Sequence, residues 1–241
     1  MLKAIEIENI KGFKLRGFLH FPEGAKEIVV MLHGFTGNKT EHGGHFRNLS
    51  RRLEKINVAS MRLDYHGNGE SDGDFSDFIF EDALDDGKRM IEYASKLEGI
   101  EKVHLLGFSM GGAISSLIAD EKIQKLCLWS PAGSMNTIAE RAEKGWRKLD
   151  NGNYFIPGFE MSPKFIQSIN KFTMYQNCVN IKNETLIIQG TKDITVVPEL
   201  AIRYNNEIVN SKLHFIEGAG HGYDAYEQKE ELYATTVEFF E

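Results

Sequence analysis

The chain has 241 residues, of which 41% are hydrophobic and 26% are charged, and its formal net charge is -7. This length and composition suit one large α/β domain with a full core. The acidic balance argues against nucleic acid as a partner, because phosphate contacts need clustered Lys and Arg. No apolar stretch is long enough to span a bilayer, and the N-terminus lacks the apolar run of a signal peptide. We therefore expect a cytoplasmic protein without membrane insertion.

The first half of the chain predicts a hairpin, followed by strands and helices in turn. Residues 3–10 and 13–21 alternate polar and apolar side chains and predict the two arms of an antiparallel hairpin. Residues 27–34, EIVVMLHG, form the kind of apolar run found in strands that are buried on both faces. The spacing then predicts a helix over 45–56, a strand over 58–67, a helix over 77–97, a strand over 102–108, a helix over 110–120 and a strand over 123–131.

The same alternation returns near the end of the chain. It predicts strands over 184–190 and 212–218 and helices over 198–208 and 224–240. Together these elements predict an α/β fold with a mostly parallel eight-stranded sheet and helices on both faces. Residues 133–183 interrupt the pattern and form either a long surface connection or an inserted cap. We favour a cap, because structureless loops of this length are uncommon in compact domains.

One serine stands between two glycines where a predicted strand meets a predicted helix. Residues 107–111, Gly-Phe-Ser-Met-Gly, match the G-x-S-x-G pattern of a nucleophile elbow. A sharp turn there strains the central residue and leaves no room for side chains beside it, so the flanking residues are glycine. By itself the pattern also fits a glycine-rich turn with a capping serine. The strand before it and the helix after it favour Ser109 as a nucleophile.

A serine hydroxyl is a poor nucleophile unless a base removes its proton, so one of the eight histidines is expected to act as that base. His221, in the loop EGAGHGYD between the last strand and the last helix, is placed to reach Ser109. His33 ends a strand too, but it lies in a turn that we assign to oxyanion binding. The spacing of His42 and His45 suggests a metal site, yet a pair of loop histidines without a nearby carboxylate pair is more often polar surface. We therefore expect no metal, and we expect the other histidines to pack in the core or lie on the surface.

The base in turn needs an acid that fixes its tautomer. Asp193 directly follows the strand LIIQG and gives the order Ser, Asp, His along the chain that is typical of α/β-hydrolases. Asp64 also ends a predicted strand, but it precedes the serine. We favour Asp193.

Two backbone N–H groups are expected to hold the oxyanion of the reaction. Met110 follows the serine at the start of the helix, where its N–H faces any oxyanion formed nearby. The second donor should follow the strand VVMLHG, where Gly34 permits close approach and the Phe35 N–H can point inward. The alternative for this stretch is a plain strand-to-helix turn.

Five stretches together make the chain resemble the α/β-hydrolase superfamily and, within it, the small bacterial cinnamoyl or feruloyl esterases. They are HGFTGNKTE, RLDYHGNGESDG, LLGFSMGGAIS, GTKDITVVP and FIEGAGHGY. The resemblance implies a single α/β-hydrolase domain over 1–241 with an inserted cap or lid over 133–183. It implies a serine carboxylester hydrolase that needs no cofactor and acts on a small-molecule ester through Ser109, His221 and Asp193. It is also compatible with a homodimer, which no feature of the sequence requires.

In esterases of this kind the cap shapes the acyl pocket and holds the hydroxylated ring. We expect apolar walls, an aromatic stack and hydrogen bonds to a phenol from Val196, Val197, Trp146, Asp150, Tyr154 and Tyr175. A monoacylglycerol lipase, thioesterase or acyltransferase would use the same triad under a different cap. A hydrolase-fold binding protein without turnover is the alternative from another class, but such a protein would normally lack part of the triad or of the oxyanion loop.

Overall fold

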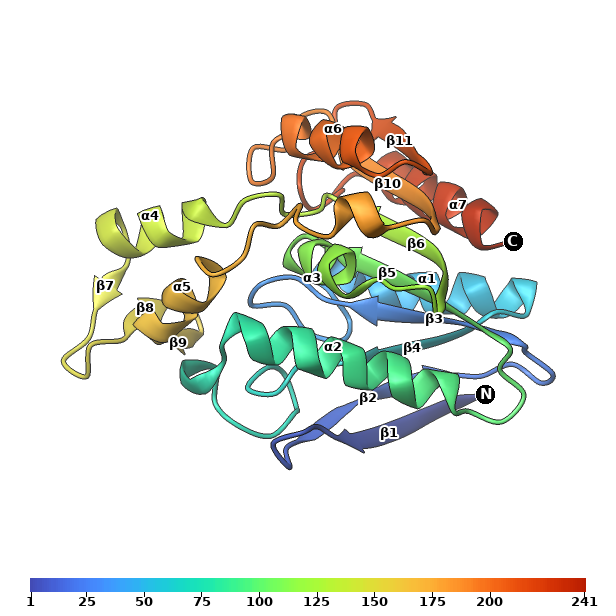
Figure 1. Cartoon of the computed structure of the whole chain (residues 1–241), viewed down its shortest axis with the longest axis horizontal. Helices are drawn as coiled ribbons and strands as arrows, with labels where there is room; N and C mark the ends of the chain where they lie inside the picture. Colours follow the sequence, from blue (N-terminus) through green and yellow to red (C-terminus); the bar gives the residue numbers. More distant parts are fainter.

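An eight-stranded sheet forms the centre of the molecule (Figure 1). The computed structural model describes all 241 residues. In spatial order the strands are β1 (Leu2–Glu8), β2 (Lys14–His20), β4 (Ala59–Leu63), β3 (Glu27–Leu32), β5 (Lys102–Phe108), β6 (Ile123–Trp129), β10 (Glu184–Gly190) and β11 (Ser211–Ile216). β1 pairs antiparallel with β2 and β2 with β4, while every other neighbouring pair is parallel. The mostly parallel sheet with an N-terminal hairpin is therefore confirmed.

Helices cover both faces of the sheet, because the central strands send apolar side chains in both directions. In β3, Val29 and Met31 enter one core cluster, whereas Ile28, Val30 and Leu32 enter the other. The first cluster lies under α1 (His45–Leu53) and α7 (Tyr226–Phe240). The second lies under α2 (Phe80–Ser95), α3 (Met110–Ile118) and α6 (Pro198–Glu207). No helix combines the length and apolar character that crossing a membrane requires.

The segment 133–183 carries secondary structure of its own. It contains α4 (Asn136–Lys144), a small sheet of β7 (Arg147–Lys148), β8 (Tyr154–Ile156) and β9 (Phe159–Met161), then α5 (Pro163–Ile169) and the short 3-10 helix η4 (Cys178–Asn180). Figure 1 shows α4, β7–β9 and α5 grouped beyond one end of the main sheet, on the side away from both chain termini. Three further 3-10 helices lie outside the segment 133–183, namely η1 (His42–Gly44), η2 (Glu54–Ile56) and η3 (Phe75–Asp77).

Four of the five buried histidines are expected to make the stability of this fold depend on pH. Burial lowers the pKa of His20, His33, His45 and His104 below the ordinary value. In the unfolded chain each imidazole returns to a pKa of about 6.5. Below that pH the unfolded state binds protons that the folded state does not, so the free energy of unfolding falls as the pH decreases.

We therefore expect urea unfolding to show falling stability from pH 7 to pH 5, with each histidine contributing at most about 1.4 kcal/mol per pH unit. The substitution His20→Phe should reduce this slope, because both ring nitrogens of His20 are buried without a hydrogen-bond partner. Equal slopes for His20→Phe and the unmodified protein would contradict this account.

Candidate active site

A sharp turn between β5 and α3 presents Ser109. β5 ends at Phe108 and α3 begins at Met110, so the serine is the single residue between them. Its backbone, at φ 57° and ψ −117°, lies in a region that L-residues rarely adopt. A Cβ on Gly107 would lie 2.1 Å from the Gly111 carbonyl oxygen, and one on Gly111 would lie 1.9 Å from the Leu32 carbonyl oxygen. The two glycines are therefore required by backbone contacts.

The substitution Gly111→Ala should destabilise the protein strongly, because the added methyl group meets backbone that cannot rotate away. We expect a loss of about 3 kcal/mol or more in the free energy of unfolding. Urea unfolding of Gly220→Ala provides the control, since a Cβ there meets nothing within 4 Å. A Gly111→Ala protein as stable as that control would contradict the packing argument.

Three side chains from separate loops form one hydrogen-bonded chain. The Ser109 hydroxyl lies 3.0 Å from His221 Nε2, and His221 Nδ1 lies 2.7 Å from Asp193 Oδ2. With the ring proton on Nδ1 donated to the carboxylate, Nε2 is free to accept the serine proton. This is the geometry in which an imidazole acts as a general base toward a hydroxyl.

Asp193 is buried, and both of its carboxylate oxygens accept hydrogen bonds. Its Oδ1 accepts the backbone N–H groups of Thr195 and Val196, and its Oδ2 also accepts the Gln189 side-chain amide. Burial opposes ionisation, but the hydrogen bond and charge of His221 together with the two amides hold the pKa of Asp193 below its usual value. Asp64, the alternative considered from the sequence, instead accepts the backbone amide and the ammonium group of Lys39.

The loop after β3 brings a second amide beside Ser109. A Cβ built on Gly34 would lie 3.3 Å from the Ser109 Cβ, which shows how closely the loop approaches the serine. The Phe35 N–H has no acceptor within the protein, and Met110, as the first residue of α3, has an N–H without an intrahelical partner. Both amides predicted from the sequence are therefore unpaired beside the serine.

A buried histidine supports the loop that carries His221. His45 Nε2 donates to the Gly222 carbonyl at 2.8 Å, and its Nδ1 accepts from the Tyr233 hydroxyl at 2.6 Å. Tyr223, which follows Gly222, has a positive φ of 48°, and its hydroxyl forms a hydrogen bond with the Ser130 hydroxyl. The spacing of His45 gave no sign of this role, because the contact joins residues far apart in the sequence.

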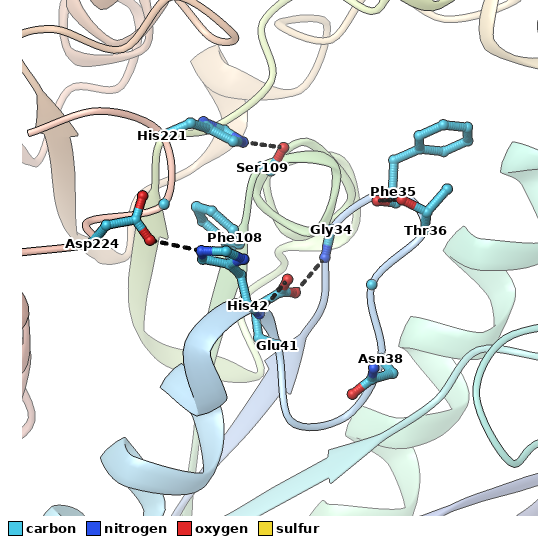
Figure 2. A pocket seen from close by; sticks show the side chains of 12 residues that line it. Gly34, Phe35, Thr36, Asn38, Glu41, His42, Phe108, Ser109, His221 and Asp224 are labelled. Carbon is cyan, nitrogen blue, oxygen red and sulfur yellow. Dashed lines mark hydrogen bonds and ion pairs between the residues drawn. The ribbon is translucent and has the colours of Figure 1, made fainter. Parts of the chain in front are cut away.

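A cavity of about 460 Å³ opens beside Ser109 and His221 (Figure 2). It is lined by residues 34–38 of the loop after β3, by Glu41 and His42, by Phe108, and by Gly222 and Asp224 of the histidine loop. His42 Nε2 and Asp224 Oδ1 are 2.8 Å apart, and Figure 2 shows this pair on the side of the cavity away from Phe35. No group of three His, Cys, Asp or Glu side chains has an arrangement that could hold a metal ion.

The six residues expected to bind substrate do not line this cavity. Val196 is buried and donates its backbone N–H to Asp193, and Val197 immediately precedes α6. Tyr175 is buried with its hydroxyl donated to the Leu200 carbonyl and the Arg203 guanidinium over its ring. The other three, Trp146, Asp150 and Tyr154, lie in and beside the small sheet of the segment 133–183. The expectation that these six contact substrate stays a prediction, although none of them lines this cavity.

Aromatic rings pack between the segment 133–183 and the loop after β3. The centroid of the Phe35 ring lies 5.1 Å from that of Phe165 in α5 and 5.6 Å from that of Phe75 in η3, and the Phe75 centroid lies 4.8 Å from that of Phe159 in β9. These rings join the segment 133–183 to the loop after β3. Every residue that lines the cavity at Ser109 lies outside 133–183.

The strand order, the serine at the turn after β5 and its hydrogen-bonded histidine define an α/β-hydrolase. The chain belongs to the family described as serine aminopeptidase, S33, whose model matches residues 23–161, more than half of the chain. It is thus a member of a hydrolase family.

Known proteins of several activities are similar to this chain. It is 28% identical over 165 residues to a putative 2-succinyl-6-hydroxy-2,4-cyclohexadiene-1-carboxylate synthase of Bacillus subtilis, which covers 63% of this chain but only 54% of that protein. It is 24% identical to a 2-hydroxy-6-oxononadienedioate/2-hydroxy-6-oxononatrienedioate hydrolase of Escherichia coli, over 84% of each. Among solved structures, Est1E from Butyrivibrio proteoclasticus, with ferulic acid bound, is 26% identical over 98% of each chain, with a TM-score of 0.83.

Proposed function

We propose that the protein is a serine carboxylester hydrolase that works through an acyl-enzyme. The continuous hydrogen-bonded chain from Ser109 through His221 to Asp193, beside an open cavity, carries this proposal. His221 removes the serine proton as the hydroxyl attacks the ester carbonyl, and it then protonates the leaving alcohol. Water, activated by the same imidazole, releases the acid and restores the serine.

The Phe35 and Met110 amides hold the oxyanion that forms at each addition. Both lack an acceptor within the protein, so they are free to donate when charge develops. A donor of this kind lowers the barrier by roughly 3 kcal/mol.

We further propose hydroxycinnamoyl esters, of the feruloyl type, as the substrate class. The similarity to Est1E, whose structure contains ferulic acid, supports this choice and spans nearly the whole chain. The names of the two curated relatives denote carboxylated compounds. No Lys or Arg lines the cavity to bind a second carboxylate, which favours an uncharged ester over a dicarboxylate.

A panel of ester substrates tests both the esterase activity and the proposed substrate class. Methyl ferulate, methyl caffeate, short p-nitrophenyl esters, a long-chain monoacylglycerol and a monomethyl dicarboxylate are each assayed with the wild type and with Ser109→Ala. We expect the highest kcat/KM with the hydroxycinnamates. A preference for the long acyl chain or for the dicarboxylate would overturn the substrate class alone, whereas no turnover of any ester by the folded wild type would overturn the esterase itself.

A further inference from the structure

Glu41 is a buried carboxylate that the mechanism above does not use. Its side chain lies under the loop after β3, is 9% exposed as a residue, and forms no ion pair with any Lys or Arg. The ammonium group of Lys39, two residues earlier, is paired with Asp64 instead. Burial raises the pKa of Glu41, while amide hydrogen bonds from Gly34 and His42 oppose this rise. An unpaired carboxylate at such a place is costly for a fold, so its contacts deserve a functional explanation.

The backbone of Glu41 is strained as well. Its φ of 59° and ψ of 169° fall in a region that is otherwise used almost only by glycine. This conformation turns the carboxylate back toward the start of the loop, as Figure 2 shows. A Cβ on Gly37 would lie 3.1 Å from both carboxylate oxygens, so a larger side chain at residue 37 would crowd the carboxylate.

The carboxylate acts on the peptide groups that orient the Phe35 amide. Glu41 Oε2 accepts the Gly34 N–H at 2.7 Å, a short bond strengthened by the charge of the acceptor. The Gly34 carbonyl accepts the Gly37 N–H at 3.0 Å and lies 2.9 Å from His33 Nδ1. Because a peptide is planar and trans, fixing the Gly34 carbonyl fixes the direction of the Phe35 N–H on the other side of the same plane.

Gly34 has to be small, since it approaches Ser109 closely, and as glycine it has wide backbone freedom. Without the hydrogen bond to Glu41, only the carbonyl group of Gly34 would be fixed by hydrogen bonds. We propose that Glu41 is a positioning residue, whose carboxylate clamps the Gly34 amide and so holds the Phe35 N–H toward the substrate oxyanion. This rests on the ester hydrolysis proposed above, and it assigns Glu41 no contact with the substrate.

Three substitutions separate this role from a structural one. Glu41→Gly removes the acceptor and relieves the backbone strain, so the variant should fold. Glu41→Ala removes the acceptor and keeps the strain. Glu41→Gln keeps an oxygen that can accept the Gly34 N–H. The matched control is Asp120→Asn, because Asp120 also accepts a backbone amide, that of Lys122, but in an exposed turn.

Each protein is assayed with p-nitrophenyl acetate and titrated with phenylboronic acid, which forms a tetrahedral adduct with the serine, and with benzoate, which does not. For Glu41→Gly and Glu41→Ala we expect kcat to fall about 10- to 100-fold, somewhat less than when an oxyanion donor is deleted outright. KM and benzoate affinity should change by less than about twofold, because only transition-state binding is lost. The affinity for phenylboronic acid should fall by the same factor as kcat, because its adduct resembles the tetrahedral transition state. Glu41→Gln should recover most of the loss, and Asp120→Asn should match the wild type.

A well-folded Glu41→Gly protein with wild-type kcat and phenylboronic acid affinity would overturn the positioning role while leaving the esterase proposal intact. A rise in KM at constant kcat would also overturn it, since that pattern means lost substrate binding. A wild type that neither hydrolyses the ester nor binds phenylboronic acid would overturn the proposed function and the role of Glu41 together.

Discussion

Replacing Ser109 with alanine is expected to lower kcat for ester hydrolysis by about 10⁵- to 10⁶-fold. The hydroxyl is the only group placed 3.0 Å from His221 Nε2 at the cavity, so its removal leaves the imidazole without a nucleophile to activate. Any remaining rate would come from water and the oxyanion amides. KM should change little, because the methylene group of the side chain and the cavity walls remain.

The measurement is single-turnover and steady-state hydrolysis of a p-nitrophenyl ester, with and without trapping of an acyl-enzyme by mass spectrometry. The wild type should carry the acyl group on the peptide that contains Ser109, and the variant should carry none. Thermal melting checks that the alanine protein is folded. A folded variant that kept a rate within tenfold of the wild type would show that another residue is the nucleophile.

Replacing Asp193 with asparagine is expected to lower kcat by about 10⁴-fold. The Thr195 and Val196 amides both donate to Oδ1, so the asparagine oxygen must occupy that position. Its NH₂ group then takes the place of Oδ2 and faces His221 Nδ1, which can no longer donate. The imidazole is forced into the tautomer with the proton on Nε2, and that nitrogen cannot accept a proton from Ser109.

The tautomer can be observed directly by ¹⁵N NMR of the imidazole in the wild type and in Asp193→Asn, alongside kcat. The wild type should carry the proton on Nδ1 and the variant on Nε2. A variant that kept the wild-type tautomer and a rate within tenfold would refute the role of Asp193. Melting temperatures of the two proteins check that the effect on rate is not a loss of folded protein.

The sheet and the serine turn were predictable because their signals are local. Residues 27–34 read as a doubly buried strand and 102–108 as a strand from their local sequence alone, and the glycines around Ser109 follow from a turn that admits no side chain. His221 and Asp193 could be selected because each follows a recognisable strand, and parallel strands bring their ends to one edge. The structure brings all three side chains into one hydrogen-bonded chain.

The walls of the site could not be predicted in the same way. The segment 133–183 has no periodic pattern that fixes which side chains point toward Ser109, so Trp146 and Tyr175 were chosen only for their chemistry. Glu41 and His45 act through single contacts with Gly34 and Gly222, and such pairs leave no mark on hydrophobic spacing. The positive φ of Glu41 was equally hidden, because sequence suggests that conformation only where glycine or asparagine stands.

Phe35 connects the proposed oxyanion site with the segment 133–183. Its backbone amide is the proposed oxyanion donor, while its ring packs on Phe165 of the segment 133–183. A change in that segment is therefore also a change in the support of the amide. Exchanging 133–183 for a segment from another hydrolase should therefore alter turnover even though the segment lines no part of the cavity, unless the new segment supplies a comparable ring against Phe35. Residues 35 and 165 are accordingly expected to need joint variation whenever the segment is changed.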